Sequence, residues 1–112
     1  MPRAALIGDE TLWASGHPPG HPLRPERLRD TWDMLHAYRA FDALNTRIVP
    51  PRPPTNDELA TFHSDEYINV VRRLSQGELM LNATRFNFGA GDNPVFEGMF
   101  DSEGLKVGAA LV

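Results

Sequence analysis

The sequence predicts a helix-rich α/β fold from three observations. A short apolar run from Arg3 to Gly8 is typical of a strand buried on both faces. Apolar residues then recur at helical spacing in several later stretches. The last of these, residues 101–112, ends its apolar stripe without a glycine, a proline or a basic turn. We therefore expect the chain to be part of a larger α/β domain.

Composition argues against several classes of protein. With 41% apolar and 23% charged residues, the 112-residue chain is typical of a folded globular domain. A net charge of −4 argues against broad contact with nucleic acid or with an anionic membrane. The absence of cysteine excludes disulfides and thiolate metal ligands and fits a reducing compartment. No apolar run approaches the ~20 residues of a membrane span, so we expect a cytoplasmic protein.

The first half of the chain is expected to pass from an irregular loop into a helix. Residues 14–28 contain too many prolines and glycines for regular structure. Pro25 suits the first position of a helix that extends to about Ala43. The segment "RIVPPRPP", residues 47–54, then begins as a short strand and continues as stiff, extended chain.

Two further helices are expected next. Thr55 and Glu58 form a capping box that starts a short helix to about Phe62. Ser64 caps the following helix, and Gly77 ends it. The apolar face of this helix is expected to comprise Tyr67, Val70, Val71 and Leu74.

The stretch "FNFGAGDNPVFEGMF", residues 86–100, holds Asp92 between glycines and large apolar side chains. Its glycines and proline argue against regular structure from Gly89 to Pro94. A last helix is expected to follow, capped by Asp101 or Ser102. The apolar residues expected to anchor the bend are Phe88, Val95, Phe96, Met99 and Phe100.

No pattern of residues alone identifies a catalytic or metal site. His17 and His21 have the i, i+4 spacing of a helical zinc site, but the two prolines between them exclude a helix. We therefore favour loop histidines that bond to backbone, and we expect an exposed His36 and a His63 placed at a helix junction. The two irregular loops around His21 and Asp92 have the composition of loops built to a fixed shape.

Three motifs in series resemble one protein family. They are "GHPLRPERL" at 20–28, "PPRPPTNDELATFHSDEYINVVRRLS" at 50–75 and "FGAGDNPVFEGMFD" at 88–101. Together they resemble the N-terminal portion of the zinc-dependent deacetylases, which comprise histone deacetylases, acetoin-utilisation deacetylases and acetylpolyamine amidohydrolases. The resemblance extends from about Leu6 to Val112, and its last motif is most similar to the bacterial acetoin-utilisation branch.

The resemblance implies an arginase/deacetylase-type three-layer αβα fold with a mostly parallel sheet. Residues 1–112 would be the incomplete N-terminal segment of a single deacetylase domain. In that family a zinc ion held by two aspartates and a histidine, with a histidine pair and a tyrosine, hydrolyses the acetyl-amide of an acetyl-lysine peptide or an acetylated small molecule. This sequence contains no His-His pair and no Asp-x-His motif. The resemblance therefore implies zinc in the complete domain, but no metal ligand and no catalytic residue in this chain.

Two residues carry over by position. Asp92 matches the family's rim aspartate, which accepts hydrogen bonds from the backbone amides of the substrate. The alternative is an Asx turn, which Asp-Asn-Pro favours. Arg27 matches an arginine beside the internal channel that releases acetate. Its alternative is a structural ion pair with Glu26 or Asp30.

Four residues are expected to shape the loops that present these two side chains. They are His21, Pro22, Gly91 and Pro94. Two classes of function stay open: the leading segment of a deacetylase, or a free-standing, inactive remnant that acts at most as a binding or structural module.

Overall fold

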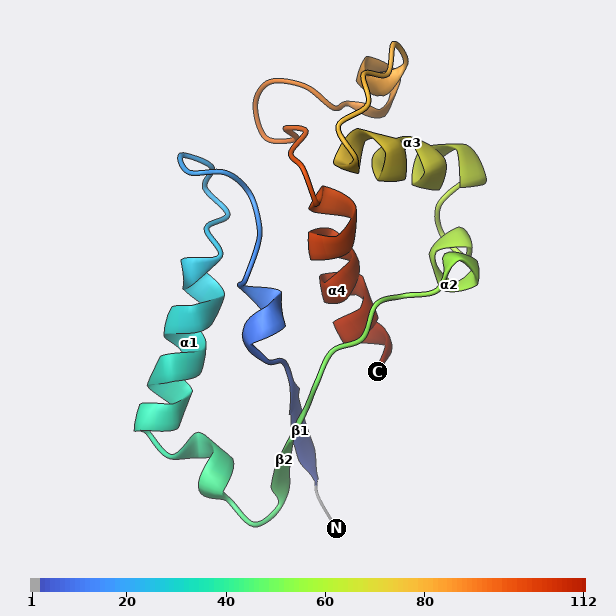
Figure 1. Ribbon diagram of the computed structural model, residues 1–112. Coiled ribbons are helices and arrows are strands. Elements are labelled where there is room, and N and C mark those ends of the chain that lie inside the picture. The colour runs from blue at the N-terminus through green and yellow to red at the C-terminus, as the bar shows by residue number, and fades with distance from the viewer. Residues whose placement is uncertain (1–2) are drawn as a thin grey trace.

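The computed structural model describes residues 3–112 and confirms the α/β class (Figure 1). Within these residues a two-stranded parallel sheet is combined with α-helices and short 3₁₀ turns. The strands are β1 (Ala4–Ile7) and β2 (Thr46–Val49). The α-helices are α1 (Glu26–Ala37), α2 (Asn56–Ala60), α3 (Asp65–Ser75) and α4 (Met99–Leu111). The 3₁₀ turns are η1 (Glu10–Leu12), η2 (Ala40–Asp42) and η3 (Ala83–Phe86).

The two strands and α1 form a parallel βαβ unit. β1 pairs with β2 in a register that places Leu6 opposite Ile48. The prediction that this first strand is buried on both faces is wrong, because Ala4 and Ala5 are exposed and Leu6 is only half-buried. Burial of both faces of a parallel strand needs helices packed on both sides of the sheet, and pairing with β2 along one edge does not supply that cover.

Helix α1 is shorter than predicted. Pro25 precedes the first helical residue instead of occupying it, and the helix ends at Ala37 rather than near Ala43. Arg39 then adopts a left-handed conformation with φ of 58°, which turns the chain into η2. This reversal brings the ring of Phe41 to 5.2 Å from that of Trp32, so aromatic packing replaces the last expected turn of helix.

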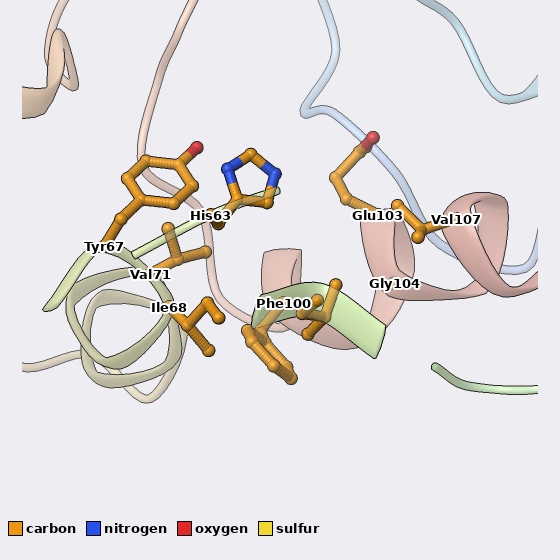
Figure 2. Close-up of a pocket in the computed structure, with 9 residues that line it drawn as sticks. His63, Tyr67, Ile68, Val71, Phe100, Glu103, Gly104 and Val107 are labelled. Carbon is orange, nitrogen blue, oxygen red and sulfur yellow. The ribbon is translucent and has the colours of Figure 1, made fainter. Parts of the chain in front are cut away.

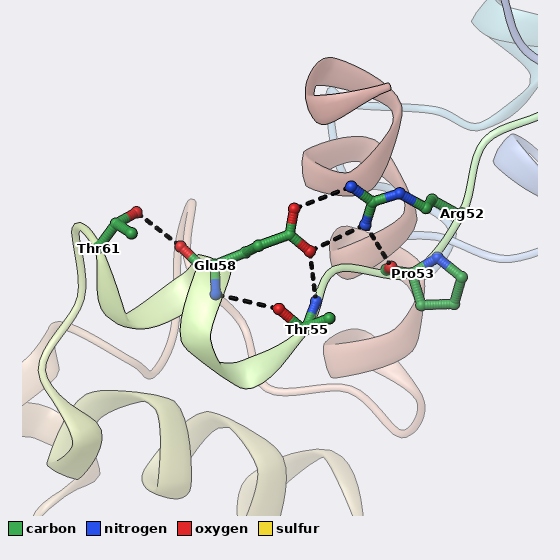
Figure 3. Close-up of polar contacts among 5 residues, drawn as sticks. All are labelled: Arg52, Pro53, Thr55, Glu58 and Thr61. Carbon is green, nitrogen blue, oxygen red and sulfur yellow. Dashed lines mark hydrogen bonds and ion pairs between the residues drawn. The ribbon is translucent and has the colours of Figure 1, made fainter.

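The capping predictions for α2 and α3 are confirmed. The Thr55 hydroxyl accepts a hydrogen bond from the Glu58 backbone N–H, and the Glu58 carboxylate accepts one from the Thr55 N–H. Ser64 caps α3 through the Tyr67 N–H, and Gly77 follows the end of α3 with φ of 89°. The Glu58 carboxylate also forms a forked ion pair with the Arg52 guanidinium, at 2.9 and 2.8 Å (Figure 3). The capping motif in the sequence did not predict this contact.

This ion pair predicts an acid-sensitive step in stability. The hydrogen bonds from Arg52, and next that from the Thr55 N–H, lower the pKa of Glu58 to about 2. An unfolded glutamate titrates near ~4.3, so the stabilisation is complete above that pH and is lost as the pH falls towards 2. In the natural polypeptide we expect Glu58→Gln to lower the urea midpoint at pH 7 and to differ progressively less from the wild type below pH 4. Asp57→Asn, in the same turn, is the control, and a pH-independent deficit would contradict the prediction.

The core lies between α3 and α4. It consists of Val70, Leu74 and Met99, with half-buried Phe86, Phe88 and Phe96 packed around them. Val70 and Leu74 were predicted for this face, whereas Tyr67 and Val71 are only half-buried. Ile68, at 7% exposure, was missed because it lies on the neighbouring side of α3, which α4 covers in part.

Helix α4 begins earlier than predicted. Its N-cap is Gly98, with φ of 80°, and not Asp101 or Ser102. The Gly98 N–H donates to the Ser75 carbonyl and the Phe100 N–H donates to the Ser75 hydroxyl, both at 3.0 Å. A residue at the end of α3 thus satisfies donors at the start of α4, so the helix needs no side-chain cap of its own.

Two glycines let α4 approach the proline-rich segment 50–54. A Cβ atom at Gly108 would lie 1.6 Å from the carbonyl oxygen of Arg52. A Cβ atom at Gly104, one turn earlier, would meet only Pro54 Cδ at an ordinary 3.5 Å. The segment therefore packs directly against the helix backbone at Gly108. A side chain should be tolerated at Gly104 but not at Gly108.

The described residues form an open body. The radius of gyration is 16.3 Å, whereas a compact domain of this length has one of roughly 13 Å. Several large apolar side chains are fully or largely exposed, among them Leu44, Phe62, Leu79 and Leu81. No helix within residues 3–112 combines the length and the apolar character needed to cross a membrane.

Candidate functional site

The two irregular loops singled out in the sequence meet in space. The His21 Nε2–H donates a 2.9 Å hydrogen bond to the backbone carbonyl of Asp92. The Leu23 N–H donates to the other ring nitrogen, Nδ1, at 3.1 Å. The expectation of a loop histidine bonded to backbone is therefore confirmed for His21. This contact joins loop 14–25 to the bend at 89–94, although the bonded residues are 71 positions apart.

The bend itself is held mainly through its backbone. The Gly89 N–H donates to the Asn93 carbonyl at 3.0 Å, and Gly91 adopts φ of 99°, where a side chain would be strained. The predicted irregular structure from Gly89 to Pro94 is confirmed. Asp92 is exposed, and its carboxylate accepts no hydrogen bond from any residue in the range 3–112, so the alternative of an Asx turn is not observed.

The expected anchors of the bend are only partly correct. Met99 is buried, and Phe88 and Phe96 are half-buried against the same core. Val95 is 42% exposed and is not among the residues packed against that core. Phe100 lies 4.5 Å below the guanidinium of Arg72, a cation–π contact on α3 and not a support for the bend.

The bend borders a groove with a cavity volume of about 240 Å³. Its lining is mostly apolar and also includes charged or polar side chains. The lining residues are His17, Leu23, Tyr67, Val71, Phe88, Asp92, Asn93, Pro94, Phe96, Met99 and Glu103. A mostly apolar groove with a carboxylate in its lining can accept an extended chain whose polar backbone meets that carboxylate.

A stacked histidine pair adjoins the groove through His17, which lines it. The rings of His17 and His21 stack with centroids 3.8 Å apart, and the His17 Nε2 lies 3.9 Å from a Glu103 carboxylate oxygen. Burial, and next the neighbouring His21, lower the pKa of His17 against the opposing influence of Glu103. Because an unfolded histidine titrates near ~6.5, the contribution of neutral His17 to stability is complete above that pH and declines below it.

The participation of His17 and Glu103 was missed by sequence reasoning. The i, i+4 spacing of His17 and His21 suggests a metal motif, whereas the loop places the two rings in a stack. The Nδ1 atom of His17 is buried and has no hydrogen-bond partner within residues 3–112. Nothing in the sequence around Glu103 signals that it faces a histidine far away in the chain.

Arg27 lies apart from this groove. Arg27 forms no ion pair with Glu26 or Asp30 within residues 3–112; those carboxylates lie 3.7 Å from Arg24 and 3.5 Å from Arg29. The alternative of a structural ion pair for Arg27 is therefore wrong for the described residues. Arg27 lines a separate shallow hollow, and Leu23 lines both that hollow and the groove.

A second hollow of about 110 Å³ continues the groove between α3 and α4. It shares Tyr67, Val71 and Glu103 with the groove. Figure 2 shows the polar tips of His63, Tyr67 and Glu103 on one side of the hollow, above the apolar side chains. His63 occupies the predicted helix junction, where its backbone N–H donates to the Leu59 carbonyl at 3.0 Å.

The side chains described here do not fit a zinc ion. Zinc in proteins is held by at least three histidine, cysteine or carboxylate ligands. Within residues 3–112 no three such side chains gather closely enough to hold a metal ion. The stacked pair of His17 and His21 is committed to ring packing and, for His21, to backbone hydrogen bonds.

The amino-acid sequence matches the model of one protein family, and several known proteins are similar to it over most of its length. A family model described as "Histone deacetylase domain" matches residues 21–112. The chain is 36% identical over 92 residues to the acetoin utilization protein AcuC of Bacillus subtilis, covering 81% of this chain and 23% of that protein. It is 35% identical over 95 residues to histone deacetylase HDAC1 of Drosophila melanogaster, covering 82% and 18%. It is 28% identical over 111 residues to histone deacetylase RPD3 of Saccharomyces cerevisiae, covering 97% and 25%.

The chain thus spans about a fifth to a quarter of the length of these curated relatives. The identities to the bacterial and the insect protein, 36% and 35%, do not separate the two branches.

Proposed function

The chain belongs to the histone deacetylase family, and from that premise we propose that it is the N-terminal segment of a zinc-dependent deacetylase that hydrolyses acetyl-amide bonds. In this proposal the parallel pair β1 and β2 is part of the sheet of a three-layer αβα domain. The substrate is an acetyl-lysine peptide or an acetylated small molecule such as an acetylpolyamine. The role of this segment is to receive and orient that substrate.

Asp92 is the residue proposed to grip the substrate. The observation that carries the proposal is an exposed carboxylate without a hydrogen-bond donor among residues 3–112, on a bend whose backbone is held by His21. An ionised carboxylate only accepts hydrogen bonds, so it can take two backbone N–H groups of an entering chain at once. The apolar side chains that line the adjoining groove would receive the aliphatic part of the substrate.

Arg27 is proposed to serve the release of acetate. Its guanidinium forms no ion pair within residues 3–112, which supports a role towards an external carboxylate. Arginine binds carboxylate in a forked geometry and keeps its charge at any physiological pH. Arg24 and Lys106 also line its hollow but pair with Glu26 and Glu103, so the Arg27 guanidinium is the charge left there for an anion among residues 3–112.

In this proposal the zinc ligands, the histidine pair and the tyrosine of the family are not supplied by these residues. Zinc, when bound in a complete deacetylase domain, polarises the acetyl carbonyl and the attacking water. No donor set within residues 3–112 fits that ion. We therefore assign no bond-breaking step to these residues.

The proposal is tested on the natural polypeptide purified from its source. Mass spectrometry and metal analysis should give a polypeptide longer than 112 residues with about one zinc per chain. That polypeptide should release acetate from an acetyl-lysine peptide. A mass equal to 112 residues without zinc and without acetate release would instead support the free-standing remnant.

We expect residues 1–112, produced alone, to aggregate or to remain partly unfolded. The reason is the open shape and the exposed apolar side chains, which a complete domain would cover. Size-exclusion chromatography and thermal unfolding by circular dichroism test this directly. A monomer with a sharp cooperative melt would contradict the prediction.

A further inference from the structure

We propose that His21 is a positioning residue for substrate binding, because it holds the bend from which the Asp92 carboxylate projects. The inference rests on the proposed function of Asp92. It goes beyond the expectation that His21 shapes the loop around Arg27, since the observed bond crosses to the other loop.

Both ring nitrogens of His21 are engaged, in opposite roles. Nδ1 accepts from the Leu23 N–H at 3.1 Å, and Nε2–H donates to the Asp92 carbonyl at 2.9 Å. Only the neutral tautomer that carries its proton on Nε2 can make both bonds. Stacking on His17, at 3.8 Å and an interplanar angle of 11°, fixes the plane of the ring. Three contacts therefore determine where the imidazole lies.

The bend depends on this contact because it has little other support. Residues 89–94 belong to no helix or strand, and their internal hydrogen bond joins only Gly89 and Asn93. The carbonyl that His21 binds belongs to the same residue as the gripping carboxylate. Fixing that carbonyl restricts the backbone of Asp92 and with it the direction of its side chain. The bend therefore loses its conformational entropy when the protein folds, and substrate binding does not have to order it.

A matched pair of substitutions in the natural polypeptide separates the two bonds of His21. The glutamine of His21→Gln places an amide NH₂ near the position of Nε2 and can still donate to the Asp92 carbonyl. The asparagine of His21→Asn places its amide oxygen near Nδ1, can still accept from the Leu23 N–H, and does not reach Asp92. We expect His21→Asn to raise KM for an acetyl-lysine peptide about three- to tenfold with little change in kcat. His21→Gln should stay close to the wild type.

A second measurement needs no activity. Backbone ¹⁵N relaxation should show residues 89–94 more mobile in His21→Asn than in the wild type or in His21→Gln. In the wild type, ¹⁵N shifts of the imidazole should show the proton on Nε2. Equal mobility of the bend in both variants, or a proton on Nδ1, would overturn the positioning role.

The outcomes distinguish this inference from the proposed function. If the wild type hydrolyses no acetyl-lysine peptide but the bend loosens only in His21→Asn, the deacetylase proposal fails and the positioning of Asp92 by His21 stands. If hydrolysis is normal and both variants behave alike in KM and in mobility, the positioning role fails and the proposed function stands. If His21→Asn does not fold, two measurements still test the positioning role. A proton on Nδ1 of the wild-type imidazole, or a KM of His21→Gln well above that of the wild type, would overturn it.

Discussion

Gly108→Ala is expected to destabilise the fold by about 3 kcal/mol or more, the largest structural effect that we predict. The new Cβ atom would lie 1.6 Å from the Arg52 carbonyl oxygen and 2.8 Å from the Arg52 carbonyl carbon. Both are backbone atoms, so no side-chain rotation relieves the overlap. The proline-rich segment 50–54 would have to move away from α4 and take the Arg52–Glu58 ion pair with it.

Gly104→Ala is the matched control, one helical turn away on α4. There the nearest contact of the Cβ atom is Pro54 Cδ at 3.5 Å, which is ordinary van der Waals separation. Alanine favours a helix over glycine by up to ~1 kcal/mol, so this variant should be neutral or slightly more stable. Urea midpoints of the two variants in the natural polypeptide provide the measurement. Equal effects would show that α4 does not pack on segment 50–54 as described.

Asp92→Asn should lower kcat/KM for an acetyl-lysine peptide by about ten- to a hundredfold. This range corresponds to the free energy of about 1.5–3 kcal/mol that a hydrogen bond to a charged group typically contributes. Asparagine keeps the shape of the side chain and one acceptor oxygen, so folding should be unaffected and the loss should appear mainly in KM. Because the carboxylate makes no internal hydrogen bond within residues 3–112, no structural deficit should confuse the result.

Glu97→Gln supplies the control for that experiment. Glu97 is an exposed acid five positions further along, and it does not line the groove of Asp92. Its substitution removes the same charge from the same region of the chain. If both variants lose activity equally, the effect is a general one of charge, and Asp92 has no specific role in gripping substrate.

Local features of the fold could be predicted because they depend on neighbouring residues. The capping box of Thr55 and Glu58 and the cap at Ser64 use bonds that span only three positions. The irregular course of the bend follows from its glycines and proline in the same way. The family resemblance needed more than this, because it used three motifs in their order along the chain.

Features that depend on distant residues could not be predicted from the pattern. The start of α4 at Met99, after the N-cap Gly98, is set by Ser75 at the end of another helix. The bond from His21 to Asp92 joins loops that are 71 residues apart, and neither loop contains a signal for the other. The length of α1 was overestimated because the packing of Phe41 on Trp32 outweighs helix propensity.

The central claim is that the Asp92 carboxylate binds the backbone amides of an acetylated chain. It is tested most directly by comparing an acetyl-lysine peptide with its analogue N-methylated at the amides that flank the lysine, on both the wild type and Asp92→Asn. We expect N-methylation to lower kcat/KM about ten- to a hundredfold in the wild type and far less in the variant, since the two changes remove the same hydrogen bonds. An equal loss in both proteins would contradict it.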